Sequence, residues 1–143
     1  MEKTEIKFRL LSQEELMSLE KDFVLYLAAQ GITEKEWQVI KNQEGEQLLS
    51  ILGDFSNMVW IKVFSGKEYM EYCDSGYRYL LHFREHETEM LRISLEPPHE
   101  VGHRTTPRPT NVERAMFEAL EGGARFCDKD VFDAGLQLFK GHV

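Results

Sequence analysis

Seven consecutive apolar residues, Phe23 to Ala29, lie within a predicted helix that runs from Ser12 to Gly31. Leu16 and Leu19 continue one face of this helix at helical spacing. A helix with one apolar stripe packs on a core, whereas a helix that is apolar on almost every side has neighbours on several sides. We therefore expect the rest of the chain to supply several neighbours for this helix.

Capping patterns mark where the first two helices begin. Ser12 with Glu15, and Thr33 with Glu36, have the spacing at which a hydroxyl accepts from a backbone N–H while the glutamate reaches back to the cap residue. Gly31 suits the left-handed residue that ends a helix. Because only about two residues link the two helices, we expect a tight helical hairpin.

Downstream of this hairpin, the apolar period changes from helical to alternating. Tyr69, Tyr72, Tyr77, Tyr79 and Phe83 give the middle of the chain an aromatic character, and whether residues 67–73 form strand or helix stays open. We expect helices at about 13–30, 34–42, 46–65, 112–121 and 129–140, strands within 67–95, and a strap at 96–110 that contains all four prolines.

These elements predict an α+β fold in a single domain, residues 1–143. We expect an N-terminal helical layer packed on a small two- or three-stranded antiparallel sheet, with two short C-terminal helices closing the fold. The alternation of Ile6, Phe8 and Leu10 with basic residues suits either a strand at the sheet edge or an arm against the first helix.

Charge and composition disfavour several classes of partner. The formal net charge is −8, and no block of the chain is strongly basic, so binding to nucleic acid or to an anionic membrane is not expected. No apolar stretch is long enough for a transmembrane helix, and we recognise no signal peptide. Cys73 and Cys127 form no paired motif, and we interpret them as reduced, buried thiols.

The sharpest chemical motif is His99-Glu100-Val101-Gly102-His103. On one helix face this spacing lets two imidazoles bind Zn²⁺ while the glutamate polarises the metal-bound water. The prolines that flank the motif, and its glycine, oppose a long helix here. We therefore assign no catalytic, cofactor or metal site, and keep Glu100 as an alternative catalytic residue and His99 and His103 as alternative zinc ligands.

The five aromatic residues named above allow two interpretations. Aromatic side chains on a sheet can stack on the bases of a single-stranded nucleic acid, but such binders also need a basic groove. Otherwise the aromatic face covers the helices, with the tyrosine hydroxyls reaching water. The acidic net charge favours the second interpretation.

The first half of the chain resembles a family of small uncharacterised bacterial proteins. The similarity rests on the runs Lys7–Leu16, Asp22–Ala28 and Ile32–Lys41, which contain a capped F-x-x-F-L-A-like helix followed by an E-W-x-x-I-K helix. Val59-Trp60 and Tyr69–Tyr72 add to it. The resemblance implies a bacterial cytoplasmic protein and supplies no catalytic residues.

The function expected from these observations is a non-enzymatic protein-interaction or adaptor domain, with a homodimer or another protein as its partner. The alternative is a small metal-dependent hydrolase that uses His99, Glu100 and His103 with zinc. Nucleic acid and membrane are not expected as partners, and the expected location is the cytoplasm.

Overall fold

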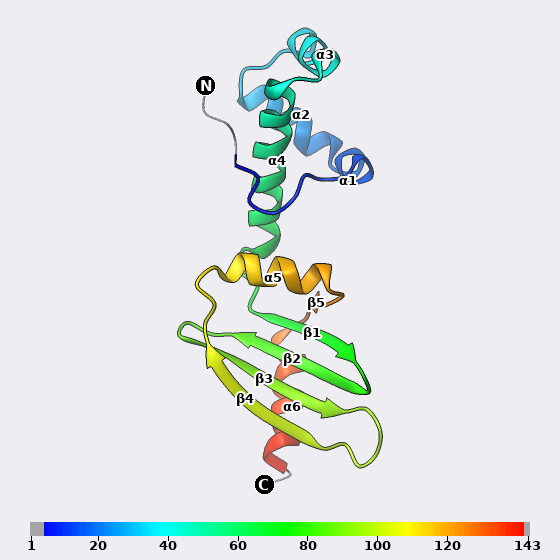
Figure 1. Ribbon diagram of the computed structural model, residues 1–143, viewed down its shortest axis with the longest axis vertical. Helices are drawn as coiled ribbons and strands as arrows, with labels where there is room; N and C mark the ends of the chain where they lie inside the picture. The colour runs from blue at the N-terminus through cyan, green and yellow to red at the C-terminus, as the bar shows by residue number, and fades with distance from the viewer. Residues whose placement is uncertain (1–4, 142–143) are drawn as a thin grey trace. The chain divides into compact units, whose positions relative to one another are not determined.

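The computed structural model describes residues 5–141 and has an α+β fold (Figure 1). The chain divides into two compact units, Met1–Val63 and Phe64–Val143, here called the helical unit and the sheet unit. Among the described residues, no helix is both long enough and apolar enough to cross a membrane.

The helical unit begins with two short helices where one was predicted. These are α1 (Gln13–Ser18) and α2 (Glu20–Ala29), which meet at Leu19. Both halves of the predicted capping box at Ser12 form, and Gly31 has the predicted left-handed conformation, with φ of 74°. The break at Leu19 involves neither glycine nor a side-chain cap, so apolar periodicity did not reveal it.

The next two helices follow the prediction closely. Helix α3 (Glu34–Gln43) begins at Thr33, whose hydroxyl accepts from the backbone N–H of Glu36 at 3.2 Å. Helix α4 (Glu46–Phe64) continues through Gly53 without interruption. Helices α2, α3 and α4 share a core cluster of Leu27, Ile40 and Ile51.

Helix α2 packs on one side only, which corrects the expectation of neighbours on several sides. Leu27 is its one buried residue, whereas Val24 and Leu25 are 57% and 68% exposed. Met17 on α1 is 71% exposed. The apolar run therefore supplies one core face and leaves an apolar outer surface.

The segment before α1 is an arm that lies along α4, and it also contacts the first helix, as one prediction had it, through the ion pair between Arg9 and Glu15. The backbone N–H of Leu11 donates to Ser56 Oγ at 3.0 Å, and Trp60 Nε1 donates to the carbonyl of Arg9 at 3.2 Å. Asn57 accepts from the backbone of this arm and donates to it. Polar side chains of α4 thus satisfy backbone groups that a strand would pair in a sheet.

The sheet unit contains a five-stranded antiparallel sheet, larger than the two or three strands predicted. Of residues 67–73, where strand or helix was left open, all from Tyr69 onward belong to a strand. The strands are β1 (Tyr69–Asp74), β2 (Tyr77–Phe83), β3 (Glu87–Ser94), β4 (Val101–Pro107) and β5 (Arg125–Phe126). Their spatial order is β4-β3-β2-β1-β5.

Strand β4 lies inside the segment predicted as an irregular strap. It pairs with β3 along its whole length, with His103 opposite Leu91 and Thr106 opposite Thr88. Most side chains of β4 are polar on both faces of the sheet. This segment therefore lacks the apolar alternation that identified β2 and β3 in the sequence. The free edge of β3 selects the extended conformation of this segment.

Two helices complete the sheet unit, α5 (Val112–Glu121) and α6 (Lys129–Gly141), as predicted. Helix α6 lies behind the sheet in Figure 1 and contacts β2, β3 and β4. Its Phe132 packs in one core cluster with Leu80, Leu91 and Ile93. Gly135, also on α6, is buried against Leu80 and Leu91, where the absence of a side chain lets the helix approach the strands closely.

Candidate interaction surface

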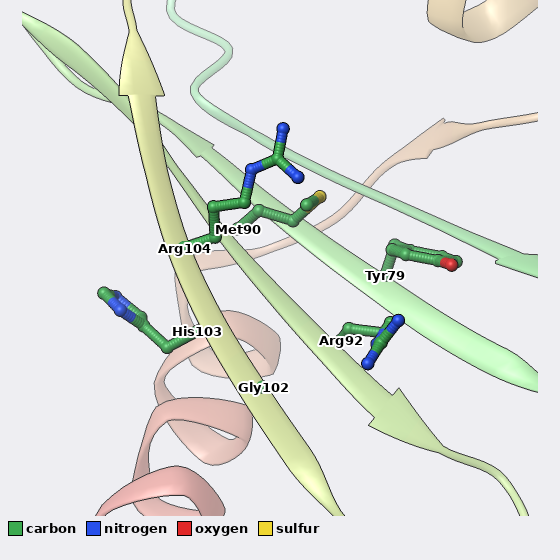
Figure 2. A pocket seen from close by; sticks show the side chains of 6 residues that line it. All are labelled: Tyr79, Met90, Arg92, Gly102, His103 and Arg104. Atoms are coloured by element: carbon green, nitrogen blue, oxygen red, sulfur yellow. The ribbon is translucent and has the colours of Figure 1, made fainter.

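The face of the sheet opposite α6 carries the side chains that could bind a partner. Directly opposed residues in an antiparallel sheet point to the same face. One cross-strand row is therefore Tyr79, Arg92 and Gly102, and the next includes Met90 and Arg104. Figure 2 shows the side chains of Tyr79, Met90, Arg92 and Arg104 together, on the side of the strands away from the α6 coil.

Contacts of aromatic rings hold several side chains of this face in place. The rings of Tyr72 and Tyr79 stack at 4.6 Å with an interplanar angle of 10°. The Arg92 guanidinium lies 4.7 Å from the ring centre of Tyr77, a distance typical of cation–π contacts. Burial is the main factor that raises the pKa of the Tyr72 hydroxyl. We call Tyr72, Tyr77, Tyr79, Met90, Arg92 and Arg104 the sheet-face cluster.

A shallow hollow of about 370 Å³ lies over β2, β3 and β4 within this cluster. Tyr79, Met90, Arg92, Gly102, His103 and Arg104 line it, and none of these is acidic. A Cβ built on Gly102 would have no atom within 4 Å, so the strand is open above this position. Within residues 5–141 the Arg104 side chain forms no hydrogen bond or ion pair, so its charge is available to an anionic group.

The predicted metal motif has a different geometry from that of a helical zinc site. His99 and Glu100 precede β4, and His103 lies within it, so these residues share no helix face. His99 Nδ1 lies 2.9 Å from the carbonyl oxygen of Ser94. Figure 2 shows His103 projecting from β4 on the side opposite Arg104.

On that other face, His103 belongs to a polar group beside α6. Its Nε2 lies 2.7 Å from Oε2 of Glu89, and its ring stacks on Phe139 of α6 at 5.1 Å. His82 Nδ1 lies 4.0 Å from the second Glu89 oxygen, and burial lowers the pKa of His82. In the described part of the chain, no group of three or more His, Cys, Asp or Glu side chains has an arrangement that could hold a metal ion.

The predicted aromatic group is divided between the two faces of the sheet. Tyr69 lies on the α6 side, stacked on His82 at 4.2 Å, and Phe83 is buried. Only the three other tyrosines contribute to the sheet-face cluster. The sequence analysis did not identify three residues of this face, Met90, Gly102 and Arg104. Gly102 and Arg104 join the face only through strand β4, which was not predicted.

The two cysteines are free thiols with different surroundings. Cys73 is exposed, which corrects the prediction that it is buried, whereas Cys127 is half-buried. Burial is the main cause that raises the pKa of the Cys127 thiol.

The helical unit has a separate apolar groove of about 910 Å³. Its lining includes Leu16, Phe23, Leu27 and Trp37, with polar residues such as Glu34 at its margin. Grooves of this kind can receive an apolar helix face. Glu20, Glu34 and Lys41 also line the groove, so charges of both signs border it and its lining does not favour one sign of charge in a partner.

Comparison with known proteins identifies a family to which this chain is similar. The model of a family of unknown function, DUF6495, matches residues 6–119, which extend beyond the resemblance seen in the first half of the sequence and include β4 and most of α5. No curated protein and no solved structure shows significant similarity to the chain. The chain therefore belongs to the family of unknown function DUF6495.

Proposed function

We propose that this protein is a non-enzymatic protein-interaction domain that binds its partner through the sheet-face cluster. The observation that carries this proposal is the ordered array formed by the Tyr72–Tyr79 stack and the Arg92–Tyr77 contact on the face opposite α6. Tyrosine and arginine, like tryptophan, are enriched among the few residues that dominate the binding energy of protein interfaces.

The chemical make-up of the cluster suits protein recognition better than catalysis. Its aromatic rings are half-buried, so each can lose further water on binding at a small cost in conformational entropy. Met90 adds an adaptable apolar contact between the rings and Arg104. The arrangement supplies anchors for a partner, and His99, Glu100 and His103 do not converge on this face.

The partner is either another protein or a second copy of this chain, in the cytoplasm of a bacterium. The resemblance of the N-terminal half to small bacterial proteins supports this setting. The net charge of −8 makes association with nucleic acid or with an anionic membrane unfavourable. Size-exclusion chromatography with light scattering distinguishes a second copy from a different partner.

The experiment is affinity purification of the full chain, expressed in the cells that produce it naturally, with quantitative mass spectrometry. Wild type is compared with Tyr79→Ala and Arg92→Glu, and with Lys140→Glu as a charge-matched control on the exposed surface of α6. We expect a protein that is captured by wild type and by the control, and whose recovery falls at least about tenfold with either cluster variant.

The captured protein must then bind the purified chain directly, with the same dependence on the two variants. Thermal unfolding of each variant shows that loss of binding is not loss of fold. Equal recovery of every captured protein with wild type and both cluster variants would refute the proposal.

A further inference from the structure

Strand β4 has one free edge. It is the first strand in the order β4-β3-β2-β1-β5, so β3 occupies one of its sides. No strand pairs with its other side within residues 5–141. A free strand edge is a template for pairing with another extended chain.

Two hydrogen bonds at the ends of the β3–β4 ladder show which backbone groups are free. The N–H of Ser94 donates to the carbonyl of Glu100 at 2.9 Å, and the N–H of Arg108 donates to the carbonyl of His86 at 3.3 Å. Because hydrogen-bonded pairs alternate in an antiparallel ladder, the even-numbered residues of β4 point their backbone groups toward β3.

The odd-numbered residues of β4 therefore point theirs outward. These are Val101, His103 and Thr105, each with an N–H and a C=O directed away from β3. Pro107 has no N–H, so it ends the usable edge. The free edge spans about five residues, enough for a short added strand.

Side chains beside this edge indicate what the added strand should carry. On the face of the sheet opposite α6, alternate side chains of the added strand would lie next to Gly102 and Arg104 and over the hollow. Arg92 is one strand further in and is held over Tyr77. Two guanidinium groups without a carboxylate among the residues of the hollow favour acidic side chains at these positions.

On the other face, the remaining side chains of the added strand would lie beside Val101 and His103. The His103 ring is itself stacked on Phe139. This side therefore suits apolar or β-branched side chains. The two faces together describe an extended segment in which acidic and apolar residues alternate.

We propose that the outer edge of β4, from Val101 to Thr105, binds an extended acidic segment of a partner protein as an additional strand. This inference rests on the proposed interaction function and names the class of partner. The backbone of β4 supplies the affinity that any extended chain would share, and Arg92 and Arg104 select the acidic side chains.

A second copy of the chain fits this edge less well. Pairing of two β4 strands about a two-fold axis at His103, the middle of the free edge, would place Arg104 opposite Gly102 of the other copy. In that register Arg104 also faces Arg92 of the other copy across Gly102, which has no side chain, so like charges come toward each other at both ends of the interface. Like charges placed together in this way disfavour pairing.

The first test uses an acetylated, amidated and fluorescein-labelled peptide, Thr-Glu-Val-Glu-Val-Glu-Thr, and fluorescence anisotropy with the full chain. The controls are the same peptide with Lys in place of Glu, and a peptide of the same composition without alternation. We expect the alternating acidic peptide to bind at least about tenfold more tightly than either control, and to weaken as salt is added. Equal affinity for all three would overturn the proposal.

The second test asks whether backbone pairing holds the peptide. N-methyl groups are placed either on the Val residues or on the inner Glu residues of the same peptide. Only one of these two sets can point its N–H groups at β4, so one modified peptide should lose at least about tenfold in affinity and the other should bind nearly as well as the parent. Equal tolerance of both modifications would rule out strand addition.

Variants of β4 test the same edge from the protein side. Thr105→Pro removes an outward N–H that the β3 ladder does not use, so the sheet should stay folded while peptide affinity falls at least about tenfold. Thr105→Ala is the control. Arg104→Glu should reverse the preference toward the Lys peptide, and Lys140→Glu should not.

The outcomes separate this inference from the proposed function. A natural partner that is lost with Arg92→Glu but retained with Thr105→Pro would leave the interaction function intact and overturn strand addition. Tighter binding of a labelled oligothymidylate than of the acidic peptide would overturn the acidic-peptide assignment. So would a dimer in solution that Thr105→Pro dissociates, because that result assigns the edge to a second copy.

Discussion

The imidazole of His103 and the carboxylate of Glu89 lie 2.7 Å apart on neighbouring strands, which directs the second histidine of the predicted metal motif toward β3. His99 meets the backbone of Ser94 instead. A zinc site needs imidazoles that converge on one point. We expect clearly substoichiometric zinc in the purified protein by plasma mass spectrometry, with the same content in His103→Ala. One equivalent of zinc that His103→Ala removes would instead support the hydrolase alternative.

A second prediction concerns stability in acid. Glu71 is buried on β1 and accepts from Nη2 of Arg78 at 2.6 Å and from Arg125 on β5. The Arg78 hydrogen bond, more than any other contact, holds the pKa of Glu71 below its ordinary value of 4.5. A carboxyl whose pKa is lowered in the folded state stabilises the fold above its unfolded pKa, and this contribution is lost as the pH falls through the folded pKa.

The stabilisation from Glu71 is thus fully present near neutral pH and declines as the pH falls below about 4.5. We expect Glu71→Gln to lower the free energy of unfolding by about 1–2 kcal/mol at pH 7. The difference from wild type should shrink as the pH falls. Urea unfolding at a series of pH values measures this, and a difference that stays constant down to acid pH would contradict it.

The close approach of α6 to the sheet gives a third prediction. A Cβ at Gly135 would stand 2.5 Å from Cδ1 of Leu80 and 3.2 Å from Cδ1 of Leu91. In Gly135→Ala, the cost of overpacking should exceed the gain in helix propensity. We expect the free energy of unfolding to fall by about 1 kcal/mol. Leu80→Val makes room at this point. The double variant should therefore lose less free energy of unfolding than the sum of the losses in the two single variants. Strictly additive effects in thermal unfolding would argue against the contact.

A fourth prediction compares two leucines on α2. Leu27 is buried with Ile40 and Ile51, whereas Leu25 is 68% exposed. Leu27→Ala should lower the free energy of unfolding of the helical unit by about 2–4 kcal/mol, because it leaves a cavity. Leu25→Ala should change it by less than about 0.5 kcal/mol. Similar losses from both variants, measured by chemical denaturation, would mean that the outer face of α2 is covered in solution.

Local signals identified most elements correctly, including the caps at Ser12 and Thr33. They failed where no local signal existed. The break at Leu19 has no turn residue, and the two-residue strand β5 is too short for any period to appear. The one-sided burial of α2 could not be read from its composition, because an apolar run does not show how many neighbours the chain will supply.

The residues of the candidate surface likewise divide into those that local sequence patterns indicated and those that they did not. The alternation of Tyr77 and Tyr79 placed two tyrosines on one face of a strand, and their role as an aromatic face was considered from the sequence alone. Arg104 and Gly102 could not be added to that face, because polar residues of a proline-rich segment give no period to follow. Their position depends on pairing with β3.

What the sequence by itself determined is the α+β class, the limits of most helices and the hairpin from Tyr77 to Ser94, whereas the structure decided that Tyr69–Asp74 is a strand. These depend on caps, turns and apolar periods, all of which act between residues close in the chain. Tertiary structure alone decided that the segment after Glu100 becomes strand β4, with a free edge beside two arginines. That choice rests on backbone hydrogen bonds to β3, which any extended segment can make and which the side chains of β4 do not encode.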